Sequence, residues 1–151
     1  IAITRENVSQ AEIEQAAKEA CLHESIEGFQ SGYETVVGER GVTLSGGQKQ
    51  RTAIARTLLE HAPIMVFDDA LSAVDAKTDE AIRGRLREAA GGSTMILIAH
   101  RVATLMQADQ IIVLKDGQII ERGTPQELLE QNGVFAHTAR MQSAEGEEEA
   151  E

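Results

Sequence analysis

The chain has 151 residues, 42% of them hydrophobic, which is enough for one domain with a core of its own. Its formal net charge is −11, and it lacks the basic excess typical of proteins that bind nucleic acid. A single cysteine excludes an internal disulfide framework, and no apolar run approaches the roughly 20 residues of a membrane span. The chain begins with Ile1-Ala2-Ile3 instead of Met, so we expect residue 1 to be an internal position of a longer protein.

Helices dominate the expected structure of the first 60 residues. Ser9–Glu12 forms a capping box and predicts a helix with Ile13, Ala16 and Ala17 on one face. A short helical piece follows around Glu24–Phe29, and then a polar, glycine-containing loop. Another helix is expected from Ser45 to about Glu60, because Pro63 ends the pattern.

The remaining sequence alternates apolar strands with helices. We expect strands at Ile64–Phe67 and Met95–Ala99, each apolar throughout and therefore buried on both faces. A helix at about 75–90 lies between them and ends at Gly91-Gly92. Further expected elements are a short helix at Val102–Gln107, a strand at Ile111–Leu114, a hairpin through Asp116-Gly117 into Gln118–Arg122, and a helix after Thr124-Pro125.

This alternation predicts an α/β fold with a parallel sheet that is closed by an antiparallel hairpin. We expect three parts: a helical subdomain at 1–60, an α/β part at 61–141, and an acidic, disordered tail at 142–151.

The segment Leu44–Gln48 reads Leu-Ser-Gly-Gly-Gln and has two interpretations. Ser45 and Gln48 could form nothing more than a capping box. However, Gly46 and Gly47 would then occupy the first helical turn, where each costs about 1 kcal/mol relative to Ala. A helix start with bare N–H groups and a serine hydroxyl also suits a bound anion such as phosphate.

Acidic and imidazole side chains follow the two expected parallel strands. Asp68 and Asp69 come directly after the first strand, and His100 ends the second. Alone, the two acids could be helix caps and the histidine a structural residue. Together they lie where open α/β sheets place their ligands, and carboxylates there suit Mg²⁺ with phosphate. No G-x-x-x-x-G-K-[ST] phosphate loop occurs in the sequence.

These motifs resemble those of the ATP-binding cassette (ABC) nucleotide-binding domain, of the exporter type. Leu44–Gln48 is similar to the family signature, Ile64–Asp68 to the Walker B strand, Ser72–Asp75 to the D-loop, and His100 to the switch histidine. The resemblance runs to about residue 141 and implies the C-terminal portion of the domain. Its fold would be a P-loop NTPase-like parallel sheet core, partial because the P-loop strand is missing, with an α-helical signature subdomain. The P-loop, the adenine-stacking aromatic and the Q-loop would lie upstream of Ile1.

The resemblance also implies roles for individual residues. Two such domains would form a head-to-tail dimer around two ATP molecules with Mg²⁺. The nucleotide-binding residues would be Leu44, Ser45, Gly46, Gly47 and Gln48, acting on the ATP held by the partner. Asp68 would hold Mg²⁺ at the chain's own ATP, His100 would touch its γ-phosphate, and Asp75 would line the dimer seam.

One residue departs from the family pattern. Asp69 stands where hydrolytic members have a glutamate that polarises the attacking water. One methylene less withdraws the carboxylate, and a misplacement of 1 Å can cost about 10²-fold in rate. Either this is a tolerated conservative change, or the chain is the degenerate, hydrolysis-impaired half of a heterodimeric exporter.

Two further groups of polar residues flank the signature. Glu39 and Arg40 resemble the exporter loop that couples to the membrane domain, although they could equally be a solvated ion pair. Lys49, Gln50 and Arg51 are expected to form a solvated helix face.

The resemblance therefore implies an ATPase that drives export, with a transmembrane domain upstream in the same polypeptide and a second, non-identical cassette as partners. It would work at the cytoplasmic face of a membrane, without nucleic acid. Two alternatives stay open: a soluble ABC ATPase of DNA repair or chromosome structure, and a regulatory cassette that binds ATP without hydrolysing it.

Overall fold

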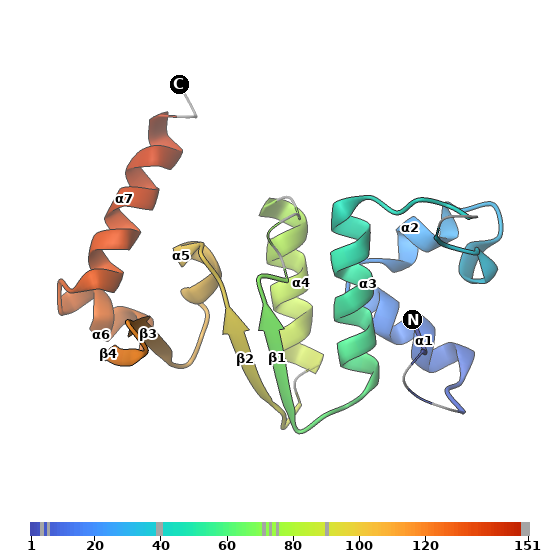
Figure 1. Ribbon diagram of the computed structural model, residues 1–151, viewed down its shortest axis with the longest axis horizontal. Helices are drawn as coiled ribbons and strands as arrows, with labels where there is room; N and C mark the ends of the chain where they lie inside the picture. Colours follow the sequence, from blue (N-terminus) through green and yellow to red (C-terminus); the bar gives the residue numbers. More distant parts are fainter. Residues whose placement is uncertain are drawn as a thin grey trace. The chain divides into compact units, whose positions relative to one another are not determined.

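The computed structural model of the chain describes residues 1–3, 5, 7–38, 41–70, 72, 74, 76–89 and 91–148. Two compact units are present, Ile1–Ile98 and Ala99–Glu151, and each is described by itself (Figure 1). From the sequence we expect other boundaries, at residues 60 and 141, and that division into three parts stays a prediction.

The first unit combines helices with a pair of strands. Its elements are α1 (Gln10–Glu19), α2 (His23–Glu27), the 3₁₀ turn η1 (Gly32–Glu34), α3 (Gly46–Leu59), β1 (Ile64–Asp68), α4 (Ala76–Ala89) and β2 (Thr94–Ile98). The mixed α/β class and these elements agree with the expectations from the sequence. Both predicted capping boxes are present. The hydroxyls of Ser9 and Ser45 each accept from the backbone N–H three residues on, and the side chain of that residue accepts from the serine N–H.

Strands β1 and β2 pair in parallel, with Ile64 opposite Thr94 and Asp68 opposite Ile98. The expectation that these strands are buried on both faces is wrong. Met65 and Phe67 are 4% and 3% exposed, whereas Ile64 and Val66 are 60% and 54% exposed. Only one face of this two-stranded sheet contributes to the core, so the apolar residues of the other face remain accessible.

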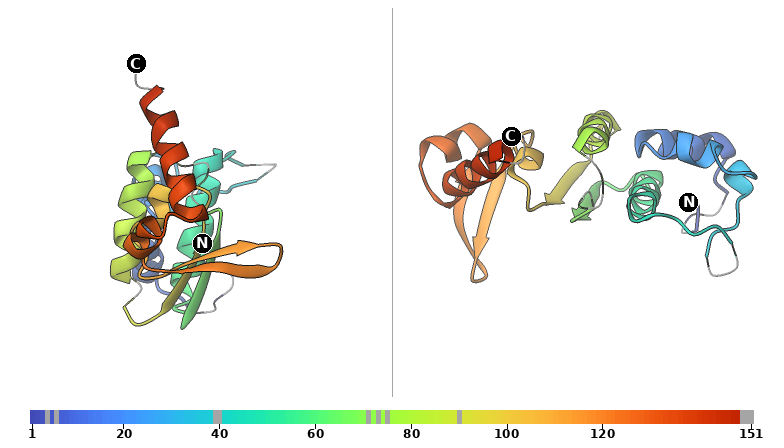
Figure 2. Two further views of the ribbon diagram at one scale, coloured as in Figure 1. Left: turned by 90° about the vertical axis from the view of Figure 1, so that its left-hand side faces the viewer. Right: turned by 90° about the horizontal axis from the view of Figure 1, so that it is seen from above.

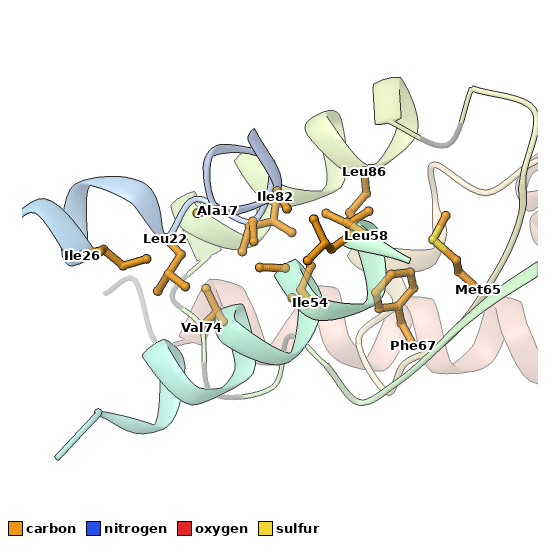
Figure 3. Close-up of a cluster of buried hydrophobic side chains, with 14 residues drawn as sticks. Ala17, Leu22, Ile26, Ile54, Leu58, Met65, Phe67, Val74, Ile82 and Leu86 are labelled. Atoms are coloured by element: carbon orange, nitrogen blue, oxygen red, sulfur yellow. The ribbon is translucent and has the colours of Figure 1, made fainter. Parts of the chain in front are cut away.

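The core of the first unit joins the helices to the sheet. Side chains from α1 to α4 pack with those of β1, and Figure 3 shows Phe67 beside the α3 residues Ile54 and Leu58. The fully buried members with the largest side chains are Ile54, Leu59 and Ile82. The signature helix α3 therefore shares one hydrophobic core with the strand that ends at Asp68.

The second unit contains α5 (Val102–Leu105), β3 (Ile111–Lys115), β4 (Gln118–Gly123), α6 (Pro125–Glu130) and α7 (Val134–Glu148). Strands β3 and β4 form the predicted antiparallel hairpin, seen as a twisted ribbon in Figure 2. Its turn residues Asp116 and Gly117 both have positive φ, 50° and 76°, as a two-residue hairpin turn requires. A small core forms around Val102, Ile111, Leu128 and Phe135.

Helix α7 extends further than the sequence indicated. It continues to Glu148, so residues 142–148, for which we expected disorder, are helical. Ala, Gln and Glu are good helix formers, and Gln142 is in addition bonded to His100 and to Val102 at the start of α5. None of the described helices combines the length and apolar character needed to cross a bilayer.

Candidate functional site

The signature segment begins helix α3 in the way a phosphate-binding helix start requires. Ser45 is the N-cap, and its hydroxyl accepts from the Gln48 N–H at 3.2 Å while its own N–H donates to Gln48 Oε1 at 2.9 Å. Gly46 and Gly47 make up the first turn, where backbone N–H groups have no acceptor within the helix. The capping-box interpretation is thus correct as local geometry, and it leaves the two glycine amides for an external acceptor.

The two acids follow β1 at its carboxyl end. Both Asp68 and Asp69 are exposed, and the Asp69 N–H donates to the Ile98 carbonyl of β2 at 3.1 Å. Asp69 has φ of 46°, in the left-handed region that Asp tolerates better than most residues. The strand pairing and this backbone turn together fix the position from which the Asp69 carboxylate projects.

Gln50, one turn into α3, connects the signature helix to this loop. Its amide nitrogen donates to the Asp69 carbonyl at 3.3 Å and to Ser72 Oγ at 2.9 Å. Ser72 Oγ in turn donates to the Asp69 carbonyl at 3.1 Å. The expected solvated role of Gln50 is therefore wrong, because an amide within reach of two acceptors exchanges water for protein partners.

Arg51 also departs from the expected solvated face. Its guanidinium donates to the Cys21 carbonyl at 2.7 Å and lies within 3.5 Å of Ser25 Oγ. Cys21 has φ of 51°, and this turn between α1 and α2 presents its carbonyl to α3. Arg51 thus holds the signature helix to the first two helices, whereas Lys49 is exposed as expected.

His100 lies in the second unit, two residues beyond the end of β2. His100 is exposed, and its backbone carbonyl accepts a hydrogen bond from Gln142 Nε2 of α7 at 2.8 Å. A shared edge for His100 and Asp68 stays a prediction from the sequence. No sequence pattern pointed to Gln142, because an exposed-looking glutamine near an acidic tail carries no recognisable signal.

Three residues of the predicted site fall outside the described part of the chain. These are Glu39 and Arg40, expected to couple to a membrane domain, and Asp75 of the D-loop. Of their neighbours, Ser72 is exposed and bonded as above, and Val74 is 5% exposed in the first core.

The donor chemistry at the end of β1 is compatible with Mg²⁺ bound together with phosphate. Within the described residues, no group of three His, Cys, Asp or Glu side chains is arranged to hold a metal ion alone. Mg²⁺ in nucleotide sites instead takes one or two carboxylates, and its remaining ligands are water and phosphate oxygens. The exposed carboxylate of Asp68 meets that smaller requirement.

A cavity of about 860 Å³ in the first unit does not coincide with the predicted site. It is lined by residues of α1, α2, α3 and α4, among them Lys18, Cys21, Arg51 and Arg85. None of Ser45, Asp68 or Asp69 contributes to its wall. Ser45, Asp68 and Asp69 are instead exposed on the surface of the first unit.

Comparison with known proteins identifies the family. The sequence model of the family described as ABC transporter matches residues 2–72, a range that includes the signature segment and β1. ATP-dependent lipid A-core flippases of Yersinia pestis bv. Antiqua (strain Antiqua) and Vibrio vulnificus (strain YJ016) are 48% and 46% identical, each over 91% of this chain and 24% of the relative.

A solved structure of a bacterial Atm1-family ABC exporter with ATP bound has the same fold. Its TM-score is 0.85 and its sequence identity 43%, over 91% of this chain and 24% of that chain. The chain thus spans about a quarter of the length of the relatives it matches. From its motifs, fold and relatives, the chain belongs to the ABC transporter family, as part of an ATPase domain of the exporter type.

Proposed function

We propose that this chain is the part of an exporter's nucleotide-binding domain that donates the signature helix and carries the acids of an ATP site. In the transporter that contains it, binding and hydrolysis of ATP at a head-to-tail cassette dimer would power translocation across a membrane. The observation that carries this proposal is the start of α3, where Ser45 caps a first turn of two glycines on a helix bonded through Gln50 to the loop after β1.

The residues act in two places. The amides of Gly46 and Gly47, with the Ser45 hydroxyl, bind the γ-phosphate of ATP held by the partner, flanked by Leu44 and Gln48. The Ser45 hydroxyl can donate its O–H to the phosphate while its oxygen still accepts from the Gln48 N–H, and the glycine amides and the helix dipole add to the attraction.

At the chain's own ATP, Asp68 holds Mg²⁺, which when bound neutralises charge on the phosphates. Asp69 orients the attacking water, His100 contacts the γ-phosphate, and Asp75 lines the dimer seam. Glu39 and Arg40 contact the membrane domain.

We further propose that the chain's own site hydrolyses ATP slowly and that the partner cassette is non-identical. The Asp69 carboxylate is one methylene shorter than the glutamate of hydrolytic members, while the signature is intact. An impaired acid beside an intact signature suits a chain that serves the competent site of its partner.

The partners are a transmembrane domain in the same polypeptide and a second cassette, at the cytoplasmic face of the membrane. Relatives bear the name lipid A-core flippase, which makes a glycolipid of that kind the first candidate for the transported substrate. Signature, fold and relatives together favour this exporter over a soluble DNA-repair ATPase.

The test is Gly47→Asp in the transporter that contains this chain. An acid in the first turn of α3 is favoured by the helix dipole, so the helix should stay folded while the carboxylate repels phosphate. We expect ATP hydrolysis to fall by at least about tenfold, with labelling by a photoreactive ATP analogue retained.

The matched control is Gly84→Asp on α4. Gly84 is exposed, and a Cβ there meets no atom within 4 Å, so the same chemical change should leave hydrolysis near the wild-type rate. Wild-type hydrolysis by Gly47→Asp, or an equal loss in both variants, would contradict the proposal.

A further inference from the structure

The side chain of Gln142, on the last helix, bridges the backbone on both sides of Arg101. Its Oε1 accepts from the Val102 N–H at 2.8 Å, and its Nε2 donates to the His100 carbonyl at 2.8 Å. Gln142 lies 40 and 42 positions from Val102 and His100 in the sequence, and it is half-buried. A single amide therefore holds the segment that carries the proposed switch histidine.

The contact satisfies a need of the local backbone. Helix α5 begins at Val102, and its N-cap, Arg101, makes no side-chain capping bond. The N–H groups of a first turn have no acceptor within the helix, so Gln142 serves as a cap supplied by another helix. Val102 itself is 8% exposed in the second core, beside Phe135 of α7. The segment is thus fixed by packing at Val102 and by the amide at His100.

We propose that Gln142 is a positioning residue for His100. The inference rests on the role proposed above for the histidine, whose ring can contact a γ-phosphate only if its main chain is held in place. A displacement of about 1 Å at a reacting group can cost about 10²-fold in rate, so a clamp of two hydrogen bonds matters for turnover. Helix α7 thereby supports the segment that carries His100.

Only an amide can make both contacts. Gln142→Glu keeps an oxygen for the Val102 N–H but has no N–H for the His100 carbonyl. Gln142→Ala loses both partners. If Gln142 has a purely structural role, the two variants should differ from the wild type in stability alone. If it positions His100, they should also hydrolyse ATP more slowly than the wild type at the same folded fraction.

The experiment measures ATP hydrolysis at the chain's own site, in the transporter that contains this chain and whose partner cassette is inactivated at its own catalytic glutamate. The variants are Gln142→Ala, Gln142→Glu, His100→Ala and the combination of Gln142→Ala with His100→Ala. We expect Gln142→Ala to lower kcat by about tenfold with KM for Mg-ATP nearly unchanged, and Gln142→Glu to lie between it and the wild type. In the His100→Ala background, removing the Gln142 amide should have no further effect, because the group it positions is absent.

Gln126→Ala is the matched control. Gln126 is also a helical glutamine, and it is exposed; among the contacts of the described chain, its amide bonds only to Glu130 one turn on. It should hydrolyse ATP like the wild type. Thermal melting of each variant establishes that it is folded, and if Gln142→Ala does not fold, the same cycle is run with Gln142→Glu.

The outcomes separate the inference from the proposed function. Wild-type hydrolysis by His100→Ala overturns the role of the histidine and the inference with it. Impaired His100→Ala beside unimpaired Gln142 variants overturns the inference alone. Losses that multiply in the double variant also overturn it, since Gln142 would then act elsewhere.

Discussion

Asp69 is the residue at which backbone and side chain impose different demands. Its φ of 46° favours Asp or Asn, because their short side chains tolerate the left-handed region. A water-polarising role favours the longer reach of Glu. The chain has the residue that suits the backbone, and its carbonyl is further fixed by Gln50 and Ser72.

We predict that Asp69→Glu raises ATP hydrolysis per dimer by up to about twofold, because the carboxylate regains its reach toward the attacking water and the chain's own site then works beside the competent site of the partner. Four hydrogen bonds on the Asp69 main chain should hold the loop against the small conformational cost of Glu. The measurement is steady-state ATPase activity per dimer.

Asp69→Asn is the control for that change. It keeps the backbone preference of Asp and removes the charge, so hydrolysis at this site should not rise. An unchanged or lower rate in Asp69→Glu would show that the acid is not what limits this site.

At the scale of elements, local sequence signals predicted the helices and strands well. The capping boxes at Ser9 and Ser45, Pro125 at a helix start, and the Asp116-Gly117 turn all occur as expected. Each of these signals acts within a few residues, so its physical cause is visible in the sequence itself.

Contacts between elements were the part that the sequence did not reveal. Gln50 and Arg51 were expected on a solvated helix face and Gln142 in a disordered tail. Each of them bonds to a backbone at least 19 residues away. The exposed face of β1 was missed for the same reason: strand composition records apolar character but not which neighbours cover it.

We predict that Gln50→Ala lowers ATP hydrolysis at the chain's own site several-fold without abolishing nucleotide binding. Two hydrogen bonds between α3 and the loop after β1 are lost, each worth about 1 kcal/mol, so the loop that carries Asp69 is less well held. Hydrogen–deuterium exchange in residues 69–72 should rise in the same variant.

Lys49→Ala is the neighbouring control, because Lys49 is exposed one residue earlier on the same helix. It removes a charge but no contact to the loop. If both variants hydrolysed ATP and exchanged deuterium alike, Gln50 would have no part in holding the loop.

At the scale of the whole molecule, the two units have separate cores, and the first leaves a face of its sheet uncovered. Ile64, Val66, Ile96 and Ile98 are between 47% and 60% exposed on that face. Contiguous apolar surface of this kind on a soluble protein marks a place where other protein packs. The chain spans about a quarter of its relatives, and further parts of such a protein could supply the cover.

Substitution of Val66 by threonine should have a favourable effect in the isolated chain and an unfavourable one in the whole transporter. Val66→Thr replaces a methyl group with a hydroxyl of nearly the same size. In the isolated chain it should reduce binding of the apolar dye ANS and raise solubility, because Val66 is 54% exposed. In the whole transporter we expect the same change to destabilise the domain by about 1–3 kcal/mol, since a buried hydroxyl without a partner carries that cost. Val36→Thr, at a 72% exposed position outside the strands, should be neutral in both settings. Equal tolerance of Val66→Thr and Val36→Thr in the transporter would mean that this face of the sheet stays open to water even in the whole protein.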